Sequence, residues 1–227
     1  MTPVKPTAST QARAEILKRL RASQPAAIAL PDVSGFYAEQ PREALETRIE
    51  RLVLNLTNAM AEVHRTTRSG LAEALAGVIR QKSLQSLAVG PEILEHQDLC
   101  ESLQAACTLL PVKTAHSETP ALFNDVAAGL TLSRASIAET GTVVLWCGPQ
   151  SPRLLSLVPP VHIVVVEAQQ VVGSLFDLMQ QQDWADGMPT NVVLVSSPSK
   201  TADIQQTLAY GAHGPKQLIV LLVEDAQ

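Results

Sequence analysis

A carboxylate followed by three small residues lies directly before an apolar segment in the middle of the chain, in the string ASIAETGTVVL at 135–145. If a pocket removes Glu139 from water, its pKa rises and it can act as a nucleophile or a general base. The structural alternative is a glutamate that caps backbone amides or pairs with Arg134 or Arg153. The residues after the carboxylate are small enough to let a ligand approach the backbone, and they are Thr140, Gly141 and Thr142.

A second polar string, SSPSKTAD at 196–203, follows an apolar segment. Its hydroxyls predict the cap of a helix, formed by Ser199 or Thr201, and free amides beside Lys200 would attract an anion. The string also fits the S-x-x-K pattern of acyl-serine hydrolases, but the companion S-D-N and K-T-G elements are missing. The candidate ligand contacts of this loop are Ser197, Ser199, Lys200, Thr201 and Asp203.

A third string, GAHGP at 211–215, contributes His213 and Gly214. His213 either binds a ligand and moves a proton, or holds the turn by hydrogen bonds. Between the first two strings, Arg153 and Ser156 are candidates to bind a small carboxylate or phosphate. Because ligands of α/β sheets gather at the carboxyl ends of strands, we expect these polar loops to line one cleft.

Composition narrows the classes of partner and cofactor. The 227 residues are 46% hydrophobic but only 3% aromatic, which predicts an aliphatic core. A net charge of -5 argues against nucleic acid as the main partner. No Walker loop or G-x-G-x-x-G string is present. The cysteines match no zinc or iron–sulfur spacing, so we predict neither metal in this chain and interpret Cys100, Cys107 and Cys147 as small buried hydrophobes.

The histidines likewise show no metal spacing. His162 lies inside an aliphatic segment and is typical of a core histidine whose ring is hydrogen-bonded. His116 and Glu118 form an H-x-E pair without the cysteine half of the zinc-deaminase pattern. No transmembrane stretch or secretory signal is visible, so we expect a cytoplasmic protein without a membrane span.

Two segments organise the chain: a helical N-terminal arm and linker at 1–41, and an α/β domain at 42–227. Apolar spacing and basic residues predict a short amphipathic helix over Thr10–Ala22. This helix either packs on its own domain or on a second copy of the chain, giving a homo-oligomer, or docks on a different protein. Prolines and a glycine within 23–41 indicate a linker.

Within 42–227, helices alternate with short aliphatic strands. The apolar period predicts helices at 42–65, 71–81, 91–106 and 169–182. Strands are predicted at 84–89, 108–112, 129–133, 142–146, 161–167, 191–196 and 217–223. Because these strands are continuously aliphatic, we expect both faces to be buried, in a mostly parallel central sheet flanked by helices.

Four strings in this order resemble the lactate utilization protein C family, the stand-alone LUD-domain proteins. They are IAETGTVVL, RLLSLVPPVHIVVV, SSPSKTADI and HGP, and they match in order and spacing over 135–223. The N-terminal third matches in kind only. The family's loop usually reads G-P-S-R-T-A-D-I-E, whereas this chain has Ser197, Lys200 and Gln205 in place of Gly, Arg and Glu. Lysine keeps the charge but loses the bidentate fork of arginine.

The resemblance implies a cytosolic bacterial protein that is needed, with iron–sulfur lactate utilization proteins of the LutA and LutB type, to oxidise L-lactate to pyruvate. It implies a sheet similar to the ribose-5-phosphate isomerase, glucosamine-6-phosphate deaminase and CoA-transferase superfamily. It also implies that this chain carries no cofactor and that the iron–sulfur clusters belong to the partners.

Two function classes remain open. In the first, the chain is a non-redox subunit that binds a small carboxylate or assembles the complex. In the second, it is a CoA-transferase-like or sugar-phosphate isomerase-like enzyme that uses Glu139, because the Glu-Thr-Gly setting is similar to the Glu-x-Gly loop of CoA-transferases. The missing cofactor fingerprint favours the first class.

Overall fold

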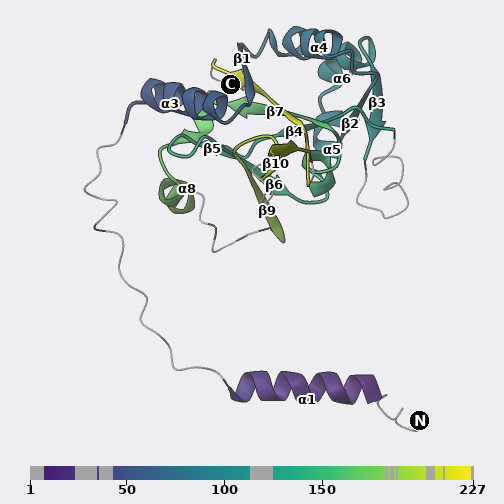
Figure 1. The fold of residues 1–227 in the computed structure, drawn as a ribbon, viewed down its shortest axis with the longest axis vertical. Helices are drawn as coiled ribbons and strands as arrows, with labels where there is room; N and C mark the ends of the chain where they lie inside the picture. The colour runs from purple at the N-terminus through teal and green to yellow at the C-terminus, as the bar shows by residue number, and fades with distance from the viewer. Residues whose placement is uncertain are drawn as a thin grey trace. The chain divides into compact units, whose positions relative to one another are not determined.

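The computed structural model describes residues 8–23, 35, 43–112, 125–181, 184, 187, 189–202, 208–211 and 213–225. The chain divides into two compact units, Met1–Pro41 and Arg42–Gln227. In the first unit, helix α1 (Ala8–Ala22) confirms the predicted helix and leaves its side chains from residue 11 onward exposed. In the second unit, a parallel sheet is enclosed between two further layers (Figure 1).

Six parallel strands form the central sheet in the order β1-β12-β7-β4-β2-β3. The strands are β1 (Glu62–Thr66), β2 (Ser86–Val89), β3 (Thr108–Pro111), β4 (Ala128–Leu132), β7 (Val161–Glu167) and β12 (Gln217–Val223). Two neighbouring interior strands, β7 and β12, are paired over all seven residues and are buried on both faces apart from one terminal residue each. The predicted α/β class with a mostly parallel sheet is therefore confirmed, and continuous aliphatic runs are its cause.

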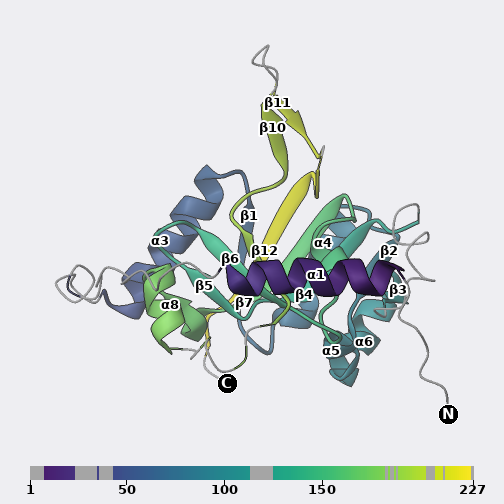
Figure 2. The same cartoon turned by 90° about the horizontal axis from the view of Figure 1, so that it is seen from below.

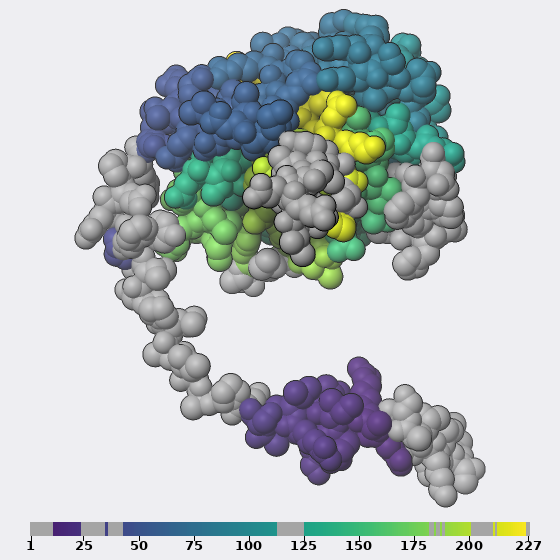
Figure 3. All heavy atoms as spheres, viewed as in Figure 1, coloured from purple at the N-terminus to yellow at the C-terminus, as the bar shows by residue number. Residues whose placement is uncertain are grey.

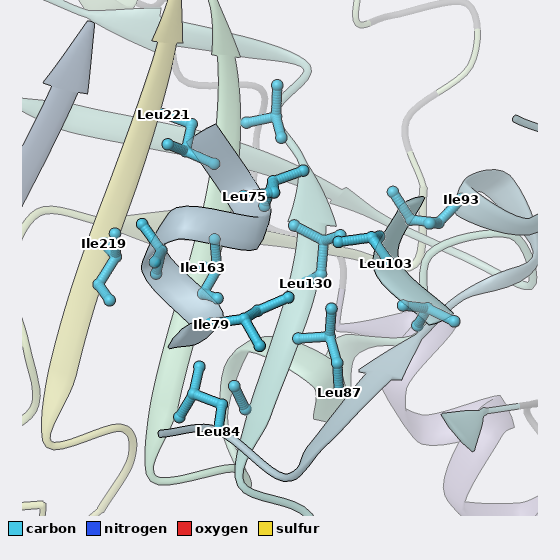
Figure 4. Close-up of a cluster of buried hydrophobic side chains, with 14 of the residues drawn as sticks. Leu75, Ile79, Leu84, Leu87, Ile93, Leu103, Leu130, Ile163, Ile219 and Leu221 are labelled. Carbon is cyan, nitrogen blue, oxygen red and sulfur yellow. The ribbon is translucent and has the colours of Figure 1, made fainter. Parts of the chain in front are cut away.

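One face of this sheet is covered by α4 (Leu71–Gln81) and α6 (Gln97–Gln104). Figure 4 shows Leu75 and Ile79 of α4 among the sheet side chains Leu130, Ile163 and Ile219. All five are at most 1% exposed. Complete burial of such a side chain contributes about 1.5–3 kcal/mol, so this layer stabilises the domain through aliphatic packing.

The opposite face is covered by α3 (Leu45–Asn58) and a second, four-stranded sheet. Its strands, in the order β8-β5-β6-β9, are β8 (Val171–Val172), β5 (Ala135–Ile137), β6 (Thr142–Cys147) and β9 (Asn191–Val195). Figure 1 shows this sheet on the other side of β7 and β4 from α4 and α6. Strand β6 is antiparallel to both neighbours, so the strands predicted at 142–146 and 191–196 lie outside the parallel sheet.

The long helix predicted over 42–65 is wrong after Asn58. Helix α3 ends at Asn58, and β1 begins at Glu62. Met60 adopts a left-handed conformation with φ 70°, and the Ala61 amide donates to the Leu56 carbonyl at 2.9 Å, which ends the helix. Met60 and, in β1, Val63 happen to continue the apolar period of the helix, and Met60 is 67% exposed.

Two other predicted helices are shorter than expected. The helix predicted at 91–106 is split into α5 (Pro91–Leu94) and α6. The helix predicted from residue 169 begins only at α8 (Leu175–Gln181), after a 3-10 turn, η3 (Ala168–Gln170), and β8. The Ser174 hydroxyl accepts from the Asp177 amide at 3.1 Å and donates to the Asp177 carboxylate at 2.9 Å. This capping-box pattern in the sequence marks the true start.

The string at 196–203 opens a hairpin, so the prediction that Ser199 or Thr201 caps a helix is wrong. Strands β10 (Lys200–Ala202) and β11 (Leu208–Tyr210) pair in antiparallel fashion. Figure 2 shows the two strands projecting from the rest of the domain. Ser199 is already extended, because its amide donates to the Pro215 carbonyl and its carbonyl accepts from the Gly211 amide, both at 2.8 Å.

The two halves of Arg42–Gln227 contribute different surfaces. In the space-filling view of Figure 3, the side chains of α3 and α4, in blue, form a continuous surface along the upper side of this domain. The later strands, in green and yellow, emerge below them. In the packing beneath this surface, Ala138 and Val143, on either side of the Glu139–Thr142 turn, belong to the same buried cluster as Leu52 and Leu56 of α3.

Candidate functional site

The Glu139–Thr142 string is the turn of the hairpin that joins β5 to β6. Asn55 of α3 donates to the carbonyls of Ala138 and Glu139 at 2.9 and 3.1 Å, which fixes the turn on the helix. Gly141 has φ 61°, and a Cβ there would lie 2.6 Å from the Asn55 Cβ. The glycine is therefore required by the turn and by its close approach to α3.

Hydroxyl groups connect this turn to the string at 196–203. The Thr140 and Thr142 hydroxyl oxygens lie 2.7 Å apart, and Thr142 lies 2.7 Å from the Ser196 hydroxyl. The Glu139 carboxylate takes no part in this series of hydroxyl contacts. Its side chain is exposed, while its backbone amide donates to the Gly173 carbonyl at 3.0 Å. Burial, which the nucleophile hypothesis requires, is not found at Glu139.

The second and third strings are joined at Ser199. Its hydroxyl accepts from the His213 amide at 3.4 Å. A Cβ on Gly214 would lie 3.3 Å from the Ser199 Cβ, so the two loops pack closely. The His213 side chain is exposed. We use the name loop cluster for these joined segments, residues 138–142, 196–199 and 213–215.

Among the other candidates of the second string, Ser197 lies within the loop cluster, whereas Lys200, Thr201 and Asp203 follow it in the sequence. Ser197 donates its hydroxyl to the neighbouring Pro198 carbonyl at 2.9 Å, and Lys200 is exposed at the start of β10. Thr201 lies in β10, with its side chain outside the described part of the structure. Asp203 lies wholly outside the described residues.

The structure separates Arg153 and Ser156 from the loop cluster. Arg153 donates to the Asn191 side chain at 3.2 Å, at the end of β9 that pairs with Cys147. Ser196 follows the other end of β9, roughly 13 Å away along five residues of strand. Ser156 is buried and donates to the Arg153 carbonyl at 3.0 Å. The single cleft expected from the sequence thus resolves into two separate neighbourhoods.

A pocket of about 510 Å³ lies near Arg153, at the carboxyl ends of β2 and β4. In parallel sheets this end gathers ligands, and the volume is within the usual range for small-molecule sites. We call it the strand-end pocket. Its lining residues are Glu92, Leu132, Ser133, Arg134, Trp146, Cys147, Gly148, Pro149, Gln150, Ser151 and Pro189.

The pocket combines a partly buried carboxyl group with a guanidinium group. Burial raises the pKa of Glu92, although hydrogen bonds from Ser151 and the Leu132 amide act in the opposite direction. The Arg134 guanidinium lies over the Trp146 ring, 5.6 Å from its centroid. These pocket residues were missed as a site from sequence, and the signal that could have found them is that most of them lie at or just after the ends of β2, β4 and β6.

The cysteines occupy both faces of the parallel sheet. Cys100 and Cys107 pack with the α4 and α6 layer, whereas Cys147 packs with the second sheet. Burial raises the pKa of all three thiols. Within the described residues, no three His, Cys, Asp or Glu side chains are grouped so that they could hold a metal ion. Nor does that part of the chain contain a helix long and apolar enough to cross a membrane.

His162 is a buried histidine in the central sheet. It is 1% exposed, and its Nε2 lies 2.9 Å from the Thr131 hydroxyl. Its Nδ1 is buried and has no hydrogen-bond partner among the described residues, so the predicted core histidine is only half satisfied. Burial lowers the pKa of His162 to about 4.

The loop cluster and the strand-end pocket both lie in a part of the chain that matches a known protein family. Residues 49–223 match the LUD domain family. The chain belongs to the LUD domain family. The resemblance seen in the four strings is thereby confirmed, and the match includes both the loop cluster and the strand-end pocket, while α1 lies outside it.

Several curated proteins are similar to this LUD domain protein over most of its length. An uncharacterized protein of Neisseria meningitidis serogroup B is 32% identical over 219 residues, 93% of each chain. Lactate utilization protein C 1 of Bacillus mycoides is 30% identical over 172 residues, 72% of this chain and 74% of the relative. YkgG of Escherichia coli K12 is 29% identical over 168 residues, 70% and 72% of the two chains.

One solved structure supports the fold of the LUD domain. The crystal structure of a DUF162 family protein from Deinococcus radiodurans superposes with a TM-score of 0.61 at 22% identity. It covers 80% of this chain and 99% of its own. At this identity the similarity shows a shared architecture.

Proposed function

We propose that this LUD domain protein is a non-redox component of a bacterial L-lactate utilization system. In this role it acts with iron–sulfur partner proteins in the oxidation of L-lactate to pyruvate. The observation that carries the proposal is the 30% identity to Lactate utilization protein C 1 of B. mycoides over about three quarters of both chains.

The distribution of the cysteines supports the assignment of redox groups to the partners. Lactate oxidation releases two electrons and two protons, which a cluster or another redox group must accept. Cysteine ligands of one cluster must converge as thiolates. Here the parallel sheet separates Cys147 from Cys100 and Cys107, and burial raises the pKa of each thiol, which favours the neutral form.

The exposed carboxylate of Glu139 gives no support to the CoA-transferase-like alternative. A glutamate that attacks a thioester must face a bound substrate in a site that excludes water. Glu139 is exposed, does not line the strand-end pocket, and is held through its backbone by Asn55. The turn has a clear structural use in joining β5–β6 to α3.

Reconstitution tests the proposed function. The iron–sulfur partner proteins are purified anaerobically and assayed for L-lactate-dependent reduction of ferricyanide, two equivalents per pyruvate formed, with and without the full-length chain. We expect oxidation to require the chain together with its partners. Equal rates without the chain, or oxidation by the chain alone, would overturn the proposal.

A further inference from the structure

The strand-end pocket is built from three segments that are distant in the sequence. Glu92 follows β2, Ser133 and Arg134 follow β4, and Gln150 and Ser151 follow β6. A Cβ on Gly90 would lie only 2.5 Å from the Gln150 carbonyl oxygen, and the Glu92 amide donates to the same oxygen at 3.2 Å. The segments after β2 and β6 are therefore in close backbone contact, which gives the pocket a fixed wall.

Glu92 supplies an oriented carboxyl group on this wall. Its Oε1 accepts from the Leu132 amide at 3.5 Å, and the Ser151 hydroxyl also bonds to it. Burial raises the pKa of Glu92, so at a given pH a larger fraction of this group is protonated than of an exposed glutamate. The carboxylate can accept from a ligand hydroxyl, and the protonated form can donate to a ligand carbonyl oxygen.

Arg134 and Ser133 supply hydrogen-bond donors that complement the carboxyl group of Glu92. Arg134 lies over Trp146, and this contact restricts the guanidinium at the rim of the pocket. The Ser133 hydroxyl is buried and has no hydrogen-bond partner among the described residues. A buried hydroxyl without a partner costs free energy, and that cost is removed when rotation of the side chain turns the hydroxyl toward the pocket and a ligand oxygen accepts from it.

Arg153 extends the positive character of the same neighbourhood. Its charge lowers the pKa of Cys147, a lining residue, although burial raises that pKa more strongly. With the exposed guanidinium group of Arg134 and the partly buried carboxyl group of Glu92 in its lining, the pocket matches a ligand that has a carboxylate at one end and a hydroxyl or oxo group beside it.

We propose that the strand-end pocket binds a small 2-hydroxy- or 2-oxo-carboxylate. Arg134 pairs with the ligand carboxylate, Glu92 bonds the 2-oxygen, and Ser133 donates to the carboxylate. Trp146 and Pro149 contact the aliphatic part. The ligand chemistry follows from the pocket, and only the choice of L-lactate and pyruvate as probes rests on the proposed function.

Calorimetric titration of the full-length chain with L-lactate, pyruvate and acetate tests this site. We expect L-lactate and pyruvate to bind more tightly than acetate, which lacks the 2-oxygen. Arg134→Gln should weaken both by about tenfold or more, the size expected for a lost charge-assisted hydrogen bond. Glu92→Gln should reduce the preference for L-lactate over acetate, and Ser133→Ala should weaken all three with little change in volume.

Matched controls come from the exposed ion pair on α4. Arg80 and Glu73 are joined at 2.6 Å and line no part of the pocket, so Arg80→Gln and Glu73→Gln should bind like the unmodified chain. Circular dichroism shows whether each variant is folded. If Arg134→Gln does not fold, Arg134→Lys is tested in its place. Unchanged affinities in all three pocket variants, or no binding by the unmodified chain, would overturn the site.

The two proposals fail in different ways. If reconstituted oxidation needs the chain but the pocket variants bind ligand normally, the proposed role in lactate utilization is supported and the proposed ligand site is contradicted. If the pocket variants lose ligand binding but oxidation does not need the chain, the ligand site is supported and the proposed role in lactate utilization is contradicted.

Discussion

The loop cluster and the strand-end pocket use polar residues in opposite ways. In the loop cluster, side-chain and backbone groups bond one another: Asn55 holds the turn carbonyls, and Thr142 lies against Ser196. In the pocket, Ser133 is left without a partner among the described residues and burial raises the pKa of Glu92. The polar strings that stand out in the sequence therefore join layers of the fold. The strand ends, which carry no motif, keep polar groups that can still bind a ligand.

This contrast predicts that substitutions in the loop cluster reduce stability and substitutions in the pocket reduce binding. The largest loss is expected for Gly141→Ala, because a Cβ there would lie 2.6 Å from the Asn55 Cβ and the residue has φ 61°. Left-handed strain and overpacking together should lower the free energy of unfolding by about 4 kcal/mol. Urea unfolding measures this.

Gly77 is the matched glycine control. It lies in α4, and a Cβ there meets nothing within 4 Å. Gly77→Ala should therefore stabilise the domain by up to about 1 kcal/mol through helix propensity. Equal effects of the two substitutions would show that the turn does not depend on its contact with α3.

The core histidine gives a pH effect that belongs to neither region and must be separated from both. Burial lowers the pKa of His162 to about 4, below its value of 6.5 in the unfolded chain. The unfolded state then binds more protons between these values, so stability is full above pH 6.5 and falls as the pH decreases to 4, by on the order of 3 kcal/mol. Urea unfolding from pH 7 to 4 should show this slope in the unmodified chain and a smaller slope in His162→Gln. A variant with the unmodified slope would assign the effect to other groups.

The asparagine that binds the turn should show the next largest effect. Asn55→Ala removes both hydrogen bonds to the Ala138 and Glu139 carbonyls, and Ala138 is fully buried. We expect a loss of about 2 kcal/mol in the free energy of unfolding, with ligand affinity unchanged. Asn58→Ala, an exposed asparagine at the end of the same helix, should change it by less than about 0.5 kcal/mol. A large loss of ligand binding in Asn55→Ala alone would connect the loop cluster to the binding site.

Glu139→Gln tests whether the loop cluster performs chemistry. Because the side chain is exposed, we expect the free energy of unfolding to change by less than about 0.5 kcal/mol and reconstituted lactate oxidation to continue. Glu101→Gln on α6 is an exposed control. A folded Glu139→Gln protein that binds its partners while oxidation is lost would make Glu139 a chemical group and end the contrast drawn above.

The sequence predicts the strands better than the helices, for a physical reason. β7 and β12 begin and end at the predicted residues, because strands made almost entirely of Val, Ile and Leu are stable only when both faces are buried. The end of α3 could not be found in this way, since Met60 adopts a left-handed conformation that glycine usually provides. The helical period continued by chance into β1.

The candidate site shows the same limit. Strings of small polar residues are visible in one dimension, and the structure does bring the loops of Thr142, Ser199 and His213 together. Glu92 and Arg134 are 42 positions apart and lie in no motif, so only the parallel pairing of β2 with β4 places them in one pocket. A sequence search that listed the first three residues after each predicted strand would have included both.

The smallest stability effect is expected in the pocket, and its dependence on pH is opposite in sign to that of the core histidine. Burial raises the pKa of Glu92, so the native state holds this proton at pH values where the unfolded chain has released it. The contribution of Glu92 to stability is therefore lost as the pH rises from its ordinary value through the raised one, which is opposite in direction to the effect of His162. Glu92→Gln cannot titrate, and its amide oxygen can still accept from Ser151 and the Leu132 amide. Measured in the His162→Gln background by urea unfolding from pH 4 to 8, this variant should lose less stability with rising pH than its parent and equal or exceed it at pH 8. If Glu92→Gln instead destabilised the domain as strongly as Asn55→Ala, the pocket carboxyl would be a structural group, and the distinction between a bonded loop cluster and a pocket held ready for a ligand would be lost.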